Sequence, residues 1–171
     1  INQADIDILF LTHLHSDLLV PKSHPRIQFR GKLDSLEAAM LLTIAELPSL
    51  SEPLNELLAL TRKILRSEVL EEPLPPQCLC GLTAEELRSH SHFPQEYYGQ
   101  PHFMPQATDG RTILLLNKLR CAVRETELSA AAAFPPKQGQ PVRTDIQTAL
   151  NRMSSLLYIL MIREKAGSSK Q

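Results

Sequence analysis

Four polar residues in the second half of the chain recur at helical spacing, and their types suit the binding of a polyphosphate. Asn117, Arg120, Arg124 and Glu127 are separated by three, four and three residues. On a helix such positions lie on one face, so the spacing predicts a single polar stripe. Two guanidinium groups one turn apart, with a carboxylate one turn further on, could bind a polyphosphate.

A second stretch, residues 150–158, predicts a mostly apolar helix with Asn151 and Arg152 near its start. If this helix packs against the first, Asn151 could face the arginine stripe. The stripe also has a simpler explanation, because Arg, Asn and Glu at helical spacing most often form a solvated face with weak ion pairs. Spacing alone favours that explanation, and both interpretations stay open at this point.

The elements that must position these residues are helices. Apolar residues recur at steps of three and four, and proline or glycine stands where the pattern stops. The predicted helices cover residues 30–47, 54–69, 83–88, 111–133 and 144–163. The pattern therefore predicts an all-α fold, a helical bundle of four to five helices in one domain over residues 1–171.

Three segments outside these helices have their own predictions. Residues 6–11 could form a lone N-terminal strand, because they are an apolar run with little helical spacing. Residues 89–110 contain several prolines and paired tyrosines, which indicate an ordered loop. Residues 164–171 are expected to be a disordered tail.

The composition excludes several classes of protein. The 171 residues carry a net charge of -1 and a pI of about 6.7, so no overall field favours nucleic acid or a membrane surface. No apolar run is long enough to span a membrane. The three cysteines include a C-x-C pair rather than the C-x-x-C of zinc and redox sites, so we expect a reduced, cytoplasmic protein and assign no metal-ligating residues. Because the first residue is Ile, we expect the natural start to lie further upstream.

A different chemistry is indicated near the N-terminus. Thr12-His13-Leu14-His15-Ser16-Asp17 follows an apolar run and resembles the first motif of metallo-β-lactamase-fold hydrolases, where alternate histidines bind zinc. That motif continues with histidine, whereas this chain has Leu18, and the many strands of that fold are not predicted. A structural metal held by His13 and His15 is a weaker alternative. Imidazoles in a loop at an interface are the simplest explanation.

Four segments, in the same order along the chain, resemble the ATP:corrinoid adenosyltransferases of the PduO type. They are residues 31–38 (GKLDSLEA), 102–105 (HFMP), 119–127 (LRCAVRETE) and 150–158 (LNRMSSLLY). The likeness is closer to the ethanolamine-utilisation branch, the EutT type, through residues 12–14, 25–35, 123–127 and 149–155. The likeness covers about residues 12–162.

The resemblance implies transfer of the 5′-deoxyadenosyl group of ATP to cob(I)alamin, with release of triphosphate. Cobalt(I) is itself the nucleophile, so the protein must position the 5′ carbon and neutralise the leaving triphosphate. Catalytic roles are implied for Arg120, Arg124 and Asp34, with the Asp34 carboxylate orienting the Arg120 guanidinium. Glu37 and Ser155 stand where the family has Asn and Asp.

The resemblance also implies that ATP, cobalamin and Mg²⁺ bind at further residues. Asn117, Glu127 and Asn151 would complete the nucleotide site. The family's glycine-rich phosphate loop has no counterpart here, and Lys22 could supply positive charge instead. Phe103, within residues 89–110, could form an apolar wall beside cobalt, and we expect that segment to order over the corrin ring.

The expected partners follow from the same resemblance. The site would lie between subunits of a homotrimer or homodimer, a reductase would supply cob(I)alamin, and no nucleic acid or membrane is expected. EutT-type enzymes have a His and Cys cluster upstream of the Thr-His-Leu segment, which this sequence does not show, so the need for a metal stays open. The competing interpretation is a non-catalytic helical interaction module of the ethanolamine pathway.

Overall fold

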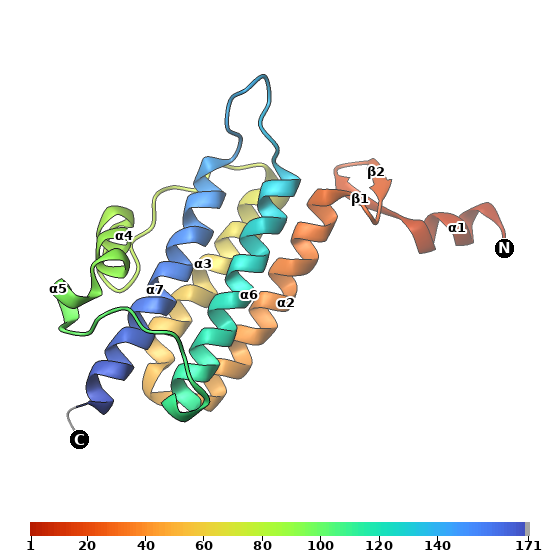
Figure 1. Ribbon diagram of the computed structural model, residues 1–171. Coiled ribbons are helices and arrows are strands. Elements are labelled where there is room, and N and C mark those ends of the chain that lie inside the picture. The colour runs from red at the N-terminus through yellow and green to blue at the C-terminus, as the bar shows by residue number, and fades with distance from the viewer. Residues whose placement is uncertain (170–171) are drawn as a thin grey trace.

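Four long helices form the body of the protein in the computed structural model, which describes residues 1–169 (Figure 1). They are α2 (Pro25–Glu46), α3 (Ser51–Leu70), α6 (Arg111–Ala133) and α7 (Thr144–Ser168). α6 packs antiparallel against both α2 and α7, and α3 packs antiparallel against α2. The predicted all-α bundle is confirmed. The prediction of a disordered tail from residue 164 is wrong as far as Ser168, and residues 170–171 lie outside the described residues.

The N-terminal segment differs from its prediction. Residues 6–11 are not a lone strand, because α1 (Gln3–Phe10) occupies most of that run and begins with a capping box between Asn2 and Asp5. The strands follow as an antiparallel pair, β1 (Leu11–His15) and β2 (Leu18–Pro21). α1 buries none of its residues and extends away from the bundle (Figure 1).

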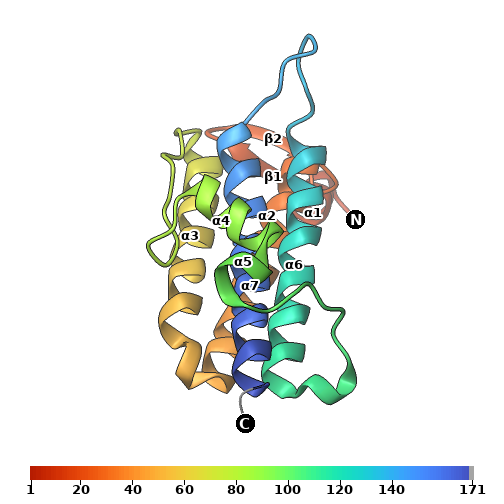
Figure 2. The same ribbon diagram turned by 60° about the vertical axis from the view of Figure 1, so that its left-hand side comes forward.

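The segment between α3 and α6 is more helical than predicted. α4 (Ala84–His92) begins where predicted, after a capping box between Thr83 and Glu86, but it continues past residue 88, and α5 (Pro94–Tyr98) follows at once. Both helices lie on α7 (Figure 2). Two 3₁₀ turns, η1 (Pro48–Leu50) and η2 (Ala107–Asp109), complete the elements. The loop predicted over residues 89–110 is therefore limited to the stretch after α5.

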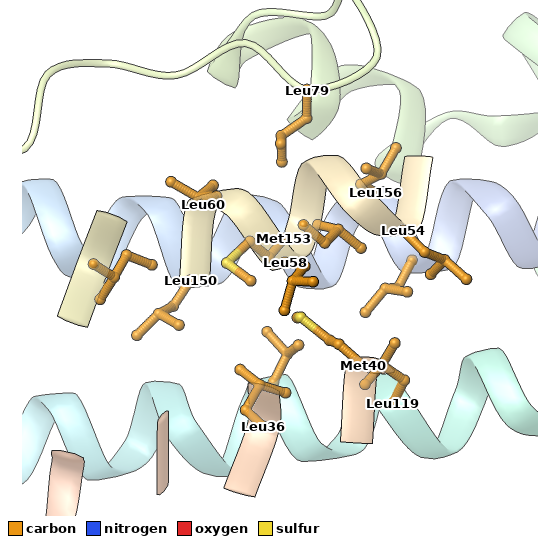
Figure 3. Close-up of a cluster of buried hydrophobic side chains, with 14 of the residues drawn as sticks. Leu36, Met40, Leu54, Leu58, Leu60, Leu79, Leu119, Leu150, Met153 and Leu156 are labelled. Carbon is orange, nitrogen blue, oxygen red and sulfur yellow. The ribbon is translucent and has the colours of Figure 1, made fainter. Parts of the chain in front are cut away.

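The core fixes how α6 and α7 are rotated, and this positions the polar stripe. Leu36 and Met40 of α2 point toward Leu119 of α6 and Met153 of α7 in the centre of the bundle (Figure 3). Each side chain is at most 2 % exposed, and burying one fully stabilises the fold by about 1.5–3 kcal/mol.

The buried positions of α6 are Leu116, Leu119, Val123 and Thr126. Every stripe residue directly follows one of them, so it is turned by about 100° from the core. The stripe consequently lies along the solvent edge of α6.

Candidate functional site

The polar stripe, Asn117, Arg120, Arg124 and Glu127, lies on α6 as predicted. Nε and Nη2 of Arg120 donate to Oδ1 of Asn117 at 3.2 and 3.0 Å. Arg124 is exposed and makes no ion pair or side-chain hydrogen bond with any of residues 1–169. An arginine in this state keeps all five N–H donors available for an anion.

Asn151 of α7 meets the stripe, so the predicted apposition of the two helices is confirmed. Its Nδ2 donates to Oε1 of Glu127 at 3.0 Å. Nη1 of Arg152 in turn donates to Oδ1 of Asn151 at 2.5 Å. The sequence pattern placed Arg152 at the helix start but gave it no role, since a lone arginine after Asn151 carries no further signal.

Asp34 does not pair with Arg120 within the chain. Asp34 is exposed on α2 and forms no ion pair with any of residues 1–169. Two other pairs, Lys32 with Glu125 at 3.6 Å and Glu46 with Arg111, mark the antiparallel register of α2 on α6. That register places Asp34 level with about residue 123 of α6, roughly 4.5 Å along the axis from Arg120. The predicted pair is therefore absent inside one chain.

Lys22 and Phe103 lie apart from the stripe. Nζ of Lys22 donates to the carbonyl of Ile8 at 2.9 Å, so its ammonium group is engaged on the N-terminal segment. Phe103 packs partly buried against the core, and Nζ of Lys165 lies 5.5 Å from its ring centroid. Lys165 is about fourteen residues, or roughly 21 Å along the helix axis, beyond Asn151. A ligand touching both the stripe and Phe103 of one chain would have to be large.

Residues after α5 are held on α7 by histidine–tyrosine contacts. Nδ1 of His102 lies 2.9 Å from the hydroxyl of Tyr158, and Nε2 lies 3.0 Å from the carbonyl of His92. Because that carbonyl can only accept, Nε2 carries a proton, and in the neutral ring Nδ1 accepts from the Tyr158 hydroxyl. Nδ1 of His90 similarly lies 2.8 Å from the hydroxyl of Tyr98. The His102 contacts hold the segment that carries Phe103 against α7.

An ionic cluster that the sequence pattern did not predict lies at the end of the bundle where α2 and α7 begin. Glu68 of α3 is fully buried, and its carboxylate accepts from Nε of Arg26 at 2.6 Å and from Nε of Arg30 at 2.5 Å. Nη2 of Arg30 also donates to the carbonyl of Leu14 in β1 at 2.6 Å. A signal was present, since Glu68 stands four residues after Ile64 on the apolar face of α3.

Arg143 and Asp145 extend this cluster. Nη2 of Arg143 donates to Oγ of Ser67 at 2.5 Å, and Nε donates to Asp145 at 3.1 Å. Asp145 also accepts from the backbone N–H of Leu74. Burial tends to raise the pKa of Asp145, but these hydrogen bonds outweigh it and hold the pKa below its usual value. We call Arg26, Arg30, Glu68, Arg143 and Asp145 the ionic cluster.

A pocket of about 490 Å³ opens beside the ionic cluster and is lined by Arg26, Phe134, Lys137 and Arg143. Both arginines lie over the Phe134 ring, each 5.8 Å from its centroid. Because the N–H groups of both arginines already meet protein acceptors, these two guanidinium groups offer an anion little that is unpaired.

No metal centre forms at the N-terminal histidines. Residues 1–169 contain no group of three or more His, Cys, Asp or Glu side chains that could hold a metal ion. His15 lies on β1 with Nε2 4.0 Å from Glu71, and the hairpin has only two strands, so the hydrolase alternative has no support.

Burial and a hydrogen bond to Glu56 raise the pKa of the Cys80 thiol to about 12, so Cys80 stays protonated near neutral pH. The described helices also lack a stretch long and apolar enough to cross a membrane.

Comparisons with known proteins agree with these features. The sequence model of a family described as cobalamin adenosyltransferase matches residues 11–164. The chain is 42% identical over 156 residues to a protein of Salmonella typhimurium strain LT2 named corrinoid adenosyltransferase EutT. It is also 42% identical over 153 residues to the protein of that name from Escherichia coli strain K12. Each match covers 89% of this chain and 57% of the relative, so the chain spans little more than half of the relatives' length.

Proposed function

The chain belongs to the cobalamin adenosyltransferase family, and from this membership we propose that it transfers the 5′-deoxyadenosyl group of ATP to cob(I)alamin. The names of its relatives support a corrinoid as the acceptor. The EutT name supports a role in ethanolamine utilisation, which we propose takes place in the cytoplasm. The observation that carries the proposal is the polar stripe with Asn151 hydrogen-bonded to Glu127 across α6 and α7.

The reaction is a nucleophilic displacement at carbon. The electron pair of cobalt(I) forms the Co–C5′ bond while the C5′–O bond of ATP breaks, and the leaving oxygen takes its electron pair away with the triphosphate. No protein nucleophile is required, and the protein acts by orientation and by charge.

Arg124 and Arg120 are proposed to bind the triphosphate, where negative charge grows as the C5′–O bond breaks. Arg124 suits this work because it has no partner among residues 1–169. Asn117 holds the guanidinium of Arg120, and Asn151 and Glu127 are proposed to contact the nucleotide. Mg²⁺ would arrive with the phosphates of ATP, and the Glu127 carboxylate is a ligand of the type that Mg²⁺ prefers.

A second copy of the chain is proposed to complete the site. Asp34 is exposed and unpaired among the described residues, so an Asp34–Arg120 pair would have to join two copies in a homodimer or homotrimer. Lys22 would then act on phosphate only after release from Ile8. Phe103 is proposed to shield cobalt from water, and a reductase is proposed to supply cob(I)alamin.

The direct test is conversion of cob(I)alamin to adenosylcobalamin by purified protein, followed by absorbance under strictly reducing conditions. We expect turnover that depends on ATP and releases one triphosphate per product. Protein that is folded and neither binds ATP nor turns over would favour the helical interaction module instead.

A further inference from the structure

The guanidinium of Arg152 has an unusual environment for an arginine near the surface of a helix. Its Nη1 donates to Oδ1 of Asn151 at 2.5 Å. Its Nε is buried and has no hydrogen-bond partner, and no carboxylate among residues 1–169 forms an ion pair with the guanidinium. A buried donor without an acceptor destabilises the fold, so stability alone does not explain this side chain.

The two neighbours of Asn151 fix which way its amide points. The guanidinium of Arg152 can only donate, and the ionised carboxylate of Glu127 can only accept. Asn151 lies between them, with its oxygen toward Arg152 and its Nδ2 toward Glu127. Turning the amide over would place donor against donor and acceptor against acceptor.

This arrangement leaves one N–H of the Asn151 amide for a ligand. Glu127 takes one of the two Nδ2 hydrogens, and Asn151 is itself exposed. The positive charge of Arg152 on the oxygen side also polarises the amide, which makes the remaining N–H a better donor. The direction of that donor depends on both neighbours.

Part of the Arg152 side chain borders open space. It lines two hollows between α7 and the segment that carries α4, of about 530 and 440 Å³. Glu85 of α4 lines both hollows yet forms no ion pair with Arg152 among the described residues. Among residues 1–169, the one hydrogen bond of the guanidinium is the bond to Asn151.

We propose that Arg152 is a positioning residue of the nucleotide site, which acts on ATP by fixing the orientation of the Asn151 amide. This inference rests on the proposed function, because it takes ATP as the ligand that Asn151 meets. Arg152 does not itself contact the reacting atoms.

The test is a double-mutant cycle of Arg152→Met and Asn151→Ala, with ATP affinity measured by titration calorimetry and KM for each substrate measured by turnover. Arg152→Met keeps an apolar side chain of similar reach but removes the donor. We expect it to weaken ATP binding about tenfold, since a charged hydrogen bond is lost, and to raise KM for ATP while KM for cob(I)alamin is unchanged. In the Asn151→Ala background the same change should have no further effect.

Two further variants separate positioning from a general structural role. Arg163→Met removes another exposed arginine of α7 that has no partner among residues 1–169, and it should bind ATP like the wild type. Arg152→Lys keeps the charge and one donor, so it should recover part of the affinity. It also provides the measurement if Arg152→Met does not fold.

The outcomes are distinct from those for the proposed function. A folded wild type that bound no ATP would contradict the proposed function and this inference together. Wild-type binding with an Arg152→Met variant that matched it, or with additive losses in the cycle, would overturn the role of Arg152 alone. A loss that raised both KM values equally would do the same, because a distorted bundle would affect both substrates.

Discussion

The two groups of arginines in this protein differ in what their N–H groups meet. In the ionic cluster, Arg26 and Arg30 donate to the buried carboxylate of Glu68 and to backbone carbonyls. On the polar stripe, Arg124 meets nothing among residues 1–169, and Arg120 meets only Asn117 and, at 4.0 Å, the sulfur of Cys121. Arginine charge that is satisfied by the protein supports the fold, whereas charge left in solvent beside a carboxylate and an amide is available to an anionic ligand.

Replacing Glu68 by Gln should have the largest effect on stability. The change leaves the guanidinium groups of Arg26 and Arg30 close together without their shared counter-charge, and we expect a loss of about 3–5 kcal/mol. Urea unfolding followed by circular dichroism measures it. Glu72→Gln is the control, because Glu72 forms an exposed pair with Arg66 at 3.7 Å whose loss should cost about 0.5 kcal/mol or less. Equal effects of the two changes would refute the distinction between the arginine groups.

Replacing Arg124 by Ala should lower activity and leave the stability of the fold unchanged. We expect kcat/KM for adenosylation to fall on the order of 10²–10³, as when one charge-stabilising donor is removed, with an unchanged unfolding midpoint. Arg111→Ala on the same helix is the control, since its exposed pair with Glu46 is remote from the stripe. Near-wild-type turnover of Arg124→Ala would mean that the stripe is only a solvated face.

Loss of the proposed Asp34–Arg120 pair should affect both activity and the association of subunits. If it forms between copies, a cycle of Asp34→Ala and Arg120→Ala should show a coupling of about 0.5–3 kcal/mol in turnover. Sedimentation of each variant shows whether the oligomer weakens with it. Additive losses in an intact oligomer would show that the two residues work separately.

The pH dependence of stability should show a smaller effect from the ionic cluster. The pKa of Asp145 is lower in the folded protein than its ordinary value of 3.8. The stability that the Asp145 carboxylate contributes is therefore fully present above pH 3.8 and is lost as the pH falls through the lower pKa of the folded state. Unfolding midpoints measured downward from pH 6 should therefore fall less steeply for Asp145→Asn than for the wild type below about pH 4. Between pH 6 and 8 the two slopes should match, because the carboxylate is ionised in both states.

The four long helices could be predicted because each buries one apolar face at regular spacing. The last turn of α4 was missed because its residues, Ser89 to His92, are polar and carry almost no periodicity. The helix α1 was missed because the apolar run after Asp5 outweighed a capping box that the sequence already contained.

The stripe and Asn151 could be predicted because neighbouring antiparallel helices bring such edges together. The absent Asp34–Arg120 contact could not, because the register of α2 on α6 is set by packing of the core. The orientation of the Asn151 side-chain amide could not be predicted from the sequence either, because it depends on where the Arg152 guanidinium lies.

The positions of these contacts along the chain have a consequence for the order of folding. Glu127 and Asn151 are 24 residues apart on one helical hairpin, whereas Arg26 and Glu68 are 42 apart and Arg143 and Ser67 are 76 apart. Closing a shorter loop costs less entropy, so the α6–α7 hairpin should form early and the ionic cluster should close late. Removing the Glu68 carboxylate should then accelerate unfolding in stopped-flow measurements while the refolding rate changes little, so that the loss shortens the lifetime of the folded protein.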